Sequence, residues 1–177
     1  LGIESARQTV ARLKKGRRVE ELEQFALNDS MTGMYNRNAY DYFVKNEKDF
    51  EGYVIVTFDL NNLKQCNDQY GHRAGDEYII NAAHIIEDNF ERYGKCYRIG
   101  GDEFCCIIPK GRYFKIERVM HKIDQDVEIL NHKNIIPVPV GIAYGYAVFT
   151  EDDTDPEKVR ERADEDMYRN KKAMKQS

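Results

Sequence analysis

The sequence lacks the features that mark membrane-spanning and exported proteins. No apolar run approaches the roughly 20 residues that cross a bilayer, and no signal-peptide pattern opens the chain. The first residue is Leu rather than Met, so we expect the 177 residues to be a piece of a longer protein. We expect a cytoplasmic domain that makes no direct membrane contact, within a parent protein that could itself be membrane-anchored.

A strong net charge is also missing. The chain has 27 Lys and Arg against 31 Asp and Glu, a net charge of -4, so nothing draws it as a whole toward a polyanion. We therefore expect no nucleic-acid polymer as a partner. With 41% hydrophobic and 33% charged residues, the composition is ordinary for a globular protein. A length of 177 residues is enough for one domain with a substantial core and a short extension.

Cysteine is scarce, and its spacing excludes the common metal and redox motifs. Cys66, Cys96, Cys105 and Cys106 form no C-x-x-C pair and show no Cys/His spacing typical of zinc. Cys105 and Cys106 follow each other in an apolar segment and would face opposite sides of a strand. We interpret the four as small buried hydrophobic residues in a reducing compartment.

Residues 1–27 have helical character but no core of their own. Apolar residues recur at coiled-coil spacing up to Gly16 and resume out of phase beyond it. They are Ile3, Ala6, Val10 and Leu13, then Val19, Leu22 and Ala26. A dimerising stalk and a helix that caps the next domain explain this segment equally well.

Residues 28–177 mix helical and strand patterns without strict βαβ alternation. The nearly unbroken apolar run at 53–60 indicates a central strand buried on both faces. A hairpin is expected at 95–109 and strand material at 136–149. Helices are expected at 38–49, through Ile79 to Phe90, at 113–131 and from Pro156 onward. The pattern predicts one α/β (α+β) sandwich with a mostly antiparallel sheet flanked by helices.

The stretch RIGGDEF, residues 98–104, places two acids at the bend of the expected hairpin. Gly100 and Gly101 are expected to adopt the positive φ of a two-residue turn. Asp59 closes the most buried strand, and beside the hairpin its carboxylate would converge with those of Asp102 and Glu103. Converging carboxylates repel one another unless a cation compensates them, and Mg²⁺ prefers such oxygen ligands. An exposed acidic turn without a function explains the local sequence about as well.

Basic residues at two places could serve a phosphate near these acids. Lys64 lies five residues after Asp59 and could reach a phosphate at the same metal. Lys171 and Lys172 could supply a second cation, or could simply interact favourably with the dipole at the end of the last helix.

A guanine site is suggested by the polar segment after residue 60. Gly71 and Gly75 allow tight turns that bring Asn67 and Asp76 toward one another. An amide with a carboxylate suits the donor and acceptor edge of guanine. Both residues could equally be helix caps.

Five motifs together resemble, in order and spacing, those of GGDEF domains, the diguanylate cyclases of bacterial signalling. They cover about residues 28–175 and read NDSMTGMYNR, FDLNNLKQCNDQYGHRAGDE, RIGGDEF, VGIAYGYA and RADEDMYRNKK. The resemblance implies a fold similar to nucleotide cyclases and the polymerase palm. It also implies the output domain of a larger bacterial signalling protein, which condenses two GTP molecules into cyclic di-GMP and releases two pyrophosphates.

The same resemblance assigns roles to individual residues. Mg²⁺, or Mn²⁺, would be held by Asp59, Asp102 and the backbone carbonyl of Leu60, and Glu103 would bind metal or activate the 3′-hydroxyl. The resemblance also implies that Asn67 and Asp76 recognise guanine and that Lys64 and Lys171 bind the β and γ phosphates. Gly100 and Gly101 would let the backbone approach the nucleotide. Because each domain binds one GTP, a homodimer of half-sites is required, and a stalk could control how the halves meet.

The sequence departs from the family pattern in three places, two single residues and one four-residue motif. Asn61 stands where a second Asp is common, and Lys175 where an Arg is common. The product-inhibition motif Arg-x-x-Asp is absent, because residues Glu91 to Gly94 read ERYG. We therefore predict that catalysis survives and that feedback inhibition through this site is missing.

Other functions stay open beside catalysis. A degenerate module could bind GTP or cyclic di-GMP and signal by conformation, a cyclase could make a different cyclic dinucleotide, and a plain dimerisation domain is conceivable. The residues that favour catalysis are all retained: Asp59, Lys64, Asp102, Glu103 and Lys171. Asp76 favours guanine, and a dimerisation domain leaves the clustered acids unexplained.

Overall fold

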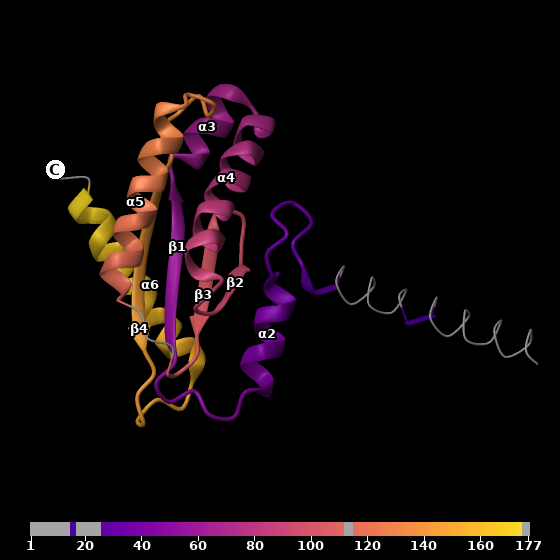
Figure 1. Cartoon of the computed structure of the whole chain (residues 1–177), viewed down its shortest axis with the longest axis vertical. Coiled ribbons are helices and arrows are strands. Elements are labelled where there is room, and N and C mark those ends of the chain that lie inside the picture. Colours follow the sequence, from indigo (N-terminus) through magenta and orange to yellow (C-terminus); the bar gives the residue numbers. More distant parts are fainter. Residues whose placement is uncertain (1–14, 17–25, 112–114, 175–177) are drawn as a thin grey trace, which may run out of the picture.

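A computed structural model describes residues 15–16, 26–111 and 115–174. A four-stranded antiparallel sheet in the order β2-β3-β1-β4 forms its centre (Figure 1). The strands are β1 (Val54–Asn61), β2 (Lys95–Arg98), β3 (Glu103–Ile108) and β4 (Gly141–Val148). The described helices are α2 (Arg37–Asn46), α3 (Leu63–Tyr70), α4 (His72–Phe90), α5 (Ile116–His132) and α6 (Pro156–Met174). The predicted fold class is confirmed.

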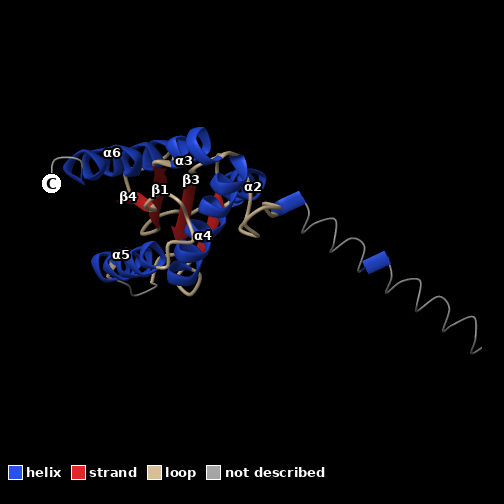
Figure 2. Cartoon of the chain, turned by 90° about the horizontal axis from the view of Figure 1, so that it is seen from above, coloured by secondary structure: helices blue, strands red, loops and turns tan. Residues whose placement is uncertain are grey.

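Helices cover the sheet on both faces, with α4 and α5 on one side and α6 on the other (Figure 2). The two faces follow from the alternation of side chains along β1. Val56, Phe58 and Leu60 belong to the core under α4 and α5, whereas Ile55 belongs to the core that includes residues of α2 and α6. Because β1 is the central strand and both of its faces are covered, its sequence is an almost continuous apolar run.

The cysteines divide between these two cores as the sequence predicts. Cys105 lies in the core on the α6 side, and Cys66, Cys96 and Cys106 lie in the core on the α4 side. All four are buried and free. Burial raises the pKa of the Cys66, Cys105 and Cys106 thiols, which suits packing rather than reactivity.

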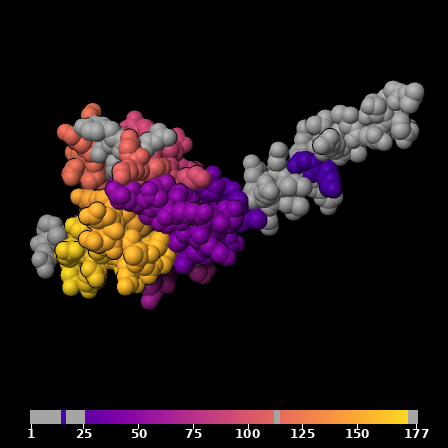
Figure 3. Space-filling model, turned by 90° about the horizontal axis from the view of Figure 1, so that it is seen from below, coloured from indigo at the N-terminus to yellow at the C-terminus, as the bar shows by residue number. Residues whose placement is uncertain are grey.

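The last strand is shorter than its sequence predicts. Of the expected 136–149 segment only Gly141–Val148 forms the ladder, because Pro137 and Pro139 lack the N–H that a strand requires. Beyond this strand Phe149 stacks on Phe50 at a centroid distance of 5.0 Å. The early part of the domain and its last strand and helix thus meet on the lower face (Figure 3).

The predicted stalk lies almost wholly outside the described residues, as does Lys175. The final helix buries Val159 and Ala163 against the sheet. No described helix has both the length and the apolar character needed to span a bilayer.

Candidate functional site

Strand pairing brings Asp59 and the GGDEF acids to one end of the sheet. In the β1–β3 register Asp59 lies opposite Glu103, so both side chains project from the face that α6 covers. The next residue along β1 is tied to the hairpin bend, because the backbone N–H of Leu60 donates to the carbonyl of Asp102 at 3.2 Å. The hairpin therefore lies beside the end of β1, as the metal hypothesis requires.

The carboxylate of Asp59 has a cation beside it from the far end of the chain. The Nζ of Lys171 on α6 lies 2.5 Å from Oδ1 of Asp59, although the two residues are 112 apart in sequence. Both side chains are about three-quarters buried, with exposed fractions of 28% for Lys171 and 23% for Asp59. The family resemblance implies that Lys171 binds phosphate and Asp59 binds metal, whereas in this structure the two side chains form an ion pair.

Asp102 and Glu103 do not form a common cluster with Asp59. Within the described residues no group of three or more His, Cys, Asp or Glu side chains is placed to hold a metal ion. Over the same part of the chain, the carboxylates of Asp102 and Glu103 have no hydrogen-bond or ion-pair partner. Of the two or three carboxylates expected to converge, Asp59 and Glu103 lie on the same face, whereas Asp102 lies opposite Leu60 in the continued register and alternates with Glu103.

The donor atoms at this end nevertheless suit a hard cation. The Oδ1 of Asn61, two residues beyond Asp59 on the same strand face, is buried and has no hydrogen-bond partner among the described residues. A buried acceptor without a partner is uncommon in proteins. The carboxylate of Asp59 lies on the same strand face, and both are oxygen donors of the kind that Mg²⁺ or Mn²⁺ takes.

A buried tyrosine fixes the backbone behind these donors. The hydroxyl of Tyr78 on α4 donates to the carbonyl of Asn61 at 2.5 Å and accepts from the N–H of Gly141 at 2.7 Å. Burial raises the pKa of Tyr78 to about 12, so it stays a neutral donor. The hydroxyl thereby joins the end of β1 to the start of β4.

The candidate guanine residues lie across the tight connection of α3 and α4. Gly71 joins the two helices with a φ of 85°, a conformation that favours glycine. Gly75 faces the Asn67 amide so closely that a Cβ on it would lie 2.0 Å from the Asn67 Oδ1. The amide thus rests against the residue before Asp76, whose own side chain is exposed. Lys64, on the first turn of α3, is exposed as well.

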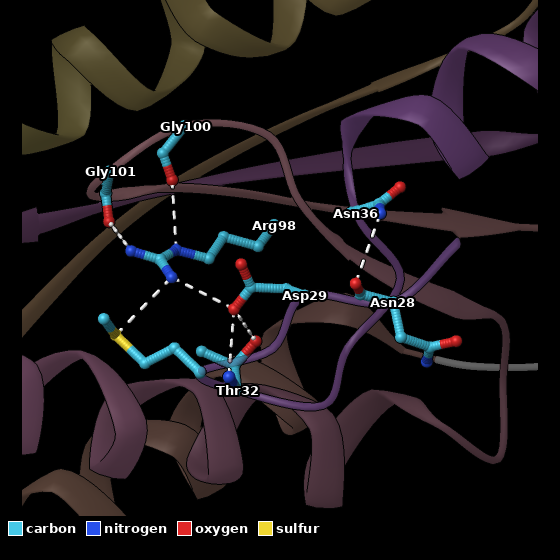
Figure 4. A network of polar contacts seen from close by, with 8 residues as sticks. Asn28, Asp29, Thr32, Asn36, Arg98, Gly100 and Gly101 are labelled. Atoms are coloured by element: carbon cyan, nitrogen blue, oxygen red, sulfur yellow. Dashed lines mark hydrogen bonds and ion pairs between the residues drawn. The ribbon is translucent and has the colours of Figure 1, made fainter. Parts of the chain in front are cut away.

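The bend of the hairpin differs from the expected two-residue turn. Neither Gly100 nor Gly101 has a positive φ, and residues 99–102 all lie between the strands. The guanidinium of Arg98 instead donates to the carbonyls of Gly100, at 3.2 Å, and Gly101, at 3.0 Å (Figure 4). This side chain holds the loop from within, so the prediction of a positive-φ glycine turn was wrong.

Arg98 also binds Asp29, a turn residue whose pairing with Arg98 the sequence does not predict. Its Nη1 lies 3.0 Å from Oδ1 of Asp29, which accepts from the backbone N–H and hydroxyl of Thr32 as well (Figure 4). Burial alone would raise the pKa of the Asp29 carboxyl, but the hydrogen bonds from Thr32 and Arg98 outweigh it and hold that pKa low. The sequence indicates Asp29 as a turn residue, but no local pattern indicates that it pairs with Arg98.

The backbone at Gly94, the last position of the missing inhibition motif, leaves no room for a side chain. A Cβ on Gly94 would lie 2.1 Å from the carbonyl oxygen of Ile107, so a side chain at this position requires the backbone to move. An Asp at the last position of the motif therefore does not fit the present backbone. The absence of feedback inhibition stays a prediction.

Comparison with known proteins supports one family. The sequence profile described as "Diguanylate cyclase, GGDEF domain" matches residues 26–177. The bifunctional diguanylate cyclase/cyclic di-GMP phosphodiesterase MucR of Pseudomonas aeruginosa is 31% identical over 147 residues, which are 78% of this chain and 22% of that protein. Diguanylate cyclase DgcS of Shewanella oneidensis is 29% identical over 158 residues, 86% of this chain and 52% of that protein.

A solved structure agrees with the fold. The coiled coil and GGDEF domain of DgcB from Caulobacter crescentus, in complex with c-di-GMP, superposes with a TM-score of 0.79 at 23% identity. The match covers 98% of this chain and 95% of that one. The chain spans between about a fifth and about a half of the length of the two curated relatives. This chain belongs to the GGDEF domain family, homologous to diguanylate cyclases.

Proposed function

We propose that this domain is a diguanylate cyclase that condenses two GTP molecules into cyclic di-GMP, as the output part of a larger signalling protein. One observation carries the proposal. Asp59, Glu103 and Lys171, from β1, β3 and α6, meet at one end of the sheet, and the Glu103 carboxylate there is left without a protein partner among the described residues. A partnerless acid beside a lysine–aspartate pair suits a phosphate and its metal better than it suits a structural role.

In the proposed reaction a 3′-hydroxyl of one GTP attacks the α-phosphorus of the other. A new P–O bond forms, the bond from the α-phosphorus to the β-phosphate oxygen breaks, and pyrophosphate leaves; the second ring-closing bond forms in the same way. Glu103, exposed at the start of β3, accepts the proton of the hydroxyl. Lys171 leaves Asp59 for the β and γ phosphates when nucleotide binds, and Lys64 approaches the same phosphates from α3.

A divalent cation belongs to this proposal. Asp59, Asp102, Glu103 and the carbonyl of Leu60 would hold Mg²⁺ or Mn²⁺. When bound, the cation supplies positive charge to the phosphates and to the departing pyrophosphate. Asn61 carries one negative charge fewer than a second aspartate, and its buried oxygen still offers a neutral donor.

Guanine selection and dimerisation complete the proposal. The Asn67 amide, held against Gly75, and the neighbouring Asp76 carboxylate can together read the hydrogen-bonding edge of guanine. Because one domain holds one GTP, the two reactants meet only when two copies face each other as a homodimer. Holding them in line supplies much of the acceleration.

The second candidate function is a GGDEF module without catalysis that binds GTP or cyclic di-GMP and regulates a partner domain. Two observations favour it: the Asp59 carboxylate is already neutralised by Lys171, and Asn61 lowers the negative charge of the site. The relative MucR, named as both a cyclase and a phosphodiesterase, carries a matching segment within a much longer chain.

Product analysis separates these functions. The purified chain is incubated with GTP, ATP and Mg²⁺, and the products are identified by mass spectrometry. We expect cyclic di-GMP from the wild type, none from Asp102→Ala, and wild-type amounts from Asp152→Ala, an exposed aspartate beyond the opposite end of β4. GTP binding without turnover supports the regulatory module, and a mixed dinucleotide contradicts the guanine assignment.

A further inference from the structure

The carboxyl-terminal helix lies along an edge of the sheet that no strand covers in the described chain. β4 is the last strand in the order β2-β3-β1-β4, so one side of its backbone has no strand partner there. Three α6 side chains bind that side instead. Arg162 Nη2 donates to the Val148 carbonyl at 3.0 Å, the Tyr146 N–H donates to Asp166 Oδ2 at 3.2 Å, and Asn170 Nδ2 donates to the Tyr144 carbonyl at 3.0 Å.

The spacing of these contacts is regular on both elements. They recur every four residues on α6 and every two residues on β4, in opposite directions. Four helical residues rise about 6 Å, and two strand residues span about 6.6 Å, so the two repeats match. The side chains of residues 162, 166 and 170 therefore form a ladder that sets the position of α6 along β4.

Beneath the ladder, α6 packs closely on β4 against a row of small residues. Ala143, Gly145 and Ala147 alternate with larger residues on β4, and Ala143 and Ala147 are buried on this side. A Cβ on Gly145 would lie 2.0 Å from the backbone N of Met167, so helix and strand backbones touch directly. Small side chains interlock little and therefore resist sliding of the helix weakly. The polar ladder supplies the axial register that this surface lacks.

The register matters because Lys171 directly follows the last rung of the ladder. Its amine reaches Asp59 only at the present height of α6. A slip by one helical turn would move Lys171 by about 5.4 Å, well beyond hydrogen-bond reach. Positioning errors of even 1 Å at a reacting site can reduce rates about 10²-fold.

We propose that Asn170 and Asp166 are positioning residues, which bind the free edge of β4 and thereby hold Lys171 at the Asp59 end of the sheet. The part of this inference that concerns phosphate binding rests on the proposed cyclase function. The part that concerns the Lys171–Asp59 contact does not. Neither residue touches the reacting groups.

The first test measures the contact without nucleotide. Acetic anhydride labelling followed by mass spectrometry gives the acylation rate of Lys171, with exposed Lys158 as internal reference. Loss of one hydrogen bond in Asn170→Ala should raise the Lys171 rate about fivefold, and Asp166→Ala should act in the same direction. Arg169→Ala is the matched control, because within the described part of the chain Arg169 bonds only to its own helix, at Glu165. Unchanged labelling of Lys171 in both ladder variants overturns the proposal, and circular dichroism verifies that they fold.

The second test is a double-mutant cycle on turnover. If Asn170 acts through Lys171, Asn170→Ala should raise KM for GTP about fivefold with little change in kcat, and should have no further effect in a Lys171→Ala background. Equal effects in both backgrounds contradict the positioning role. If the wild type makes no cyclic dinucleotide, the cyclase proposal fails while the labelling test still decides this one.

Discussion

Two polar clusters lie at the same end of the sheet, and they are built in opposite ways. The cluster around Arg98 is closed, in the sense that its charged groups bind one another and the protein. The guanidinium binds the Asp29 carboxylate and two loop carbonyls, and Asp29 also binds Thr32. Around Asp59 the cluster is open, because Lys171 is its one charged contact and the Asn61 oxygen has no partner among the described residues. Closed clusters stabilise a fold, whereas open ones leave groups for a ligand.

The largest expected effect comes from the open cluster. Glu103→Gln removes the proposed proton acceptor and should lower turnover on the order of 10³-fold or more. The free energy of unfolding should stay within about 0.5 kcal/mol of wild type, because Glu103 has no partner to lose among the described residues. Steady-state kinetics and urea denaturation on the same sample test both statements. A large loss of stability with unchanged turnover would place Glu103 in the scaffold instead.

The closed cluster should respond in the opposite way. Arg98→Met removes the guanidinium and leaves Asp29 half-paired, with two loop carbonyls unsatisfied. We expect a loss of about 2–3 kcal/mol in the free energy of unfolding by urea denaturation. Arg37→Met is the control: Arg37 pairs with Asp41 on the surface, so little change is expected. Equal losses in the two variants would remove the distinction between the clusters.

Tyr78 provides a further test of the comparison, because its hydroxyl binds the backbone of Asn61 and Gly141 next to the open cluster. Tyr78→Phe keeps the ring but leaves the Asn61 carbonyl and the Gly141 N–H without their partner. Thermal and urea unfolding should report a loss of about 1–2 kcal/mol. Tyr70→Phe, at an exposed tyrosine, should change nothing measurable. A stability of Tyr78→Phe equal to wild type would show that these two hydrogen bonds contribute little.

The smallest effect is a pH dependence of the closed cluster. The pKa of Asp29 lies below its ordinary value of 3.8 in the folded chain, so its stabilising contribution is complete above that value. It is lost as the pH falls through the folded pKa, because protonation breaks the ion pair. Unfolding curves from about pH 5 to about pH 2 should therefore converge for wild type and Asp29→Asn at the acid end. A constant gap between them would mean that Asp29 does not titrate in this range.

The sequence predicted the elements of this fold because their patterns are local. The apolar run at residues 53–60 predicted strand β1, and the spacing of Ile79 and Phe90 predicted α4. Simple alternation predicted that Cys105 and Cys106 face opposite sides. Each of these signals depends on residues that are close in sequence.

Contacts between distant segments could not be predicted in the same way. The sequence supplied Lys171 and Asp59 as candidates, but their direct pairing across 112 residues follows from the register of α6 on β4. The bend at Gly100 and Gly101 was expected to follow glycine preferences, yet Arg98 determines it by binding their carbonyls. A residue type shows which partner it could accept, and only the fold shows which partner is present.

The most direct test of the two clusters is the turnover number per folded molecule for Asp59→Asn beside Asp29→Asn, with the folded fraction taken from circular dichroism. If the open cluster performs the chemistry and the closed one supports the fold, Asp59→Asn should lose on the order of 10³-fold in turnover while Asp29→Asn keeps most of it. Wild-type turnover in Asp59→Asn, or equal losses in both, would contradict that division.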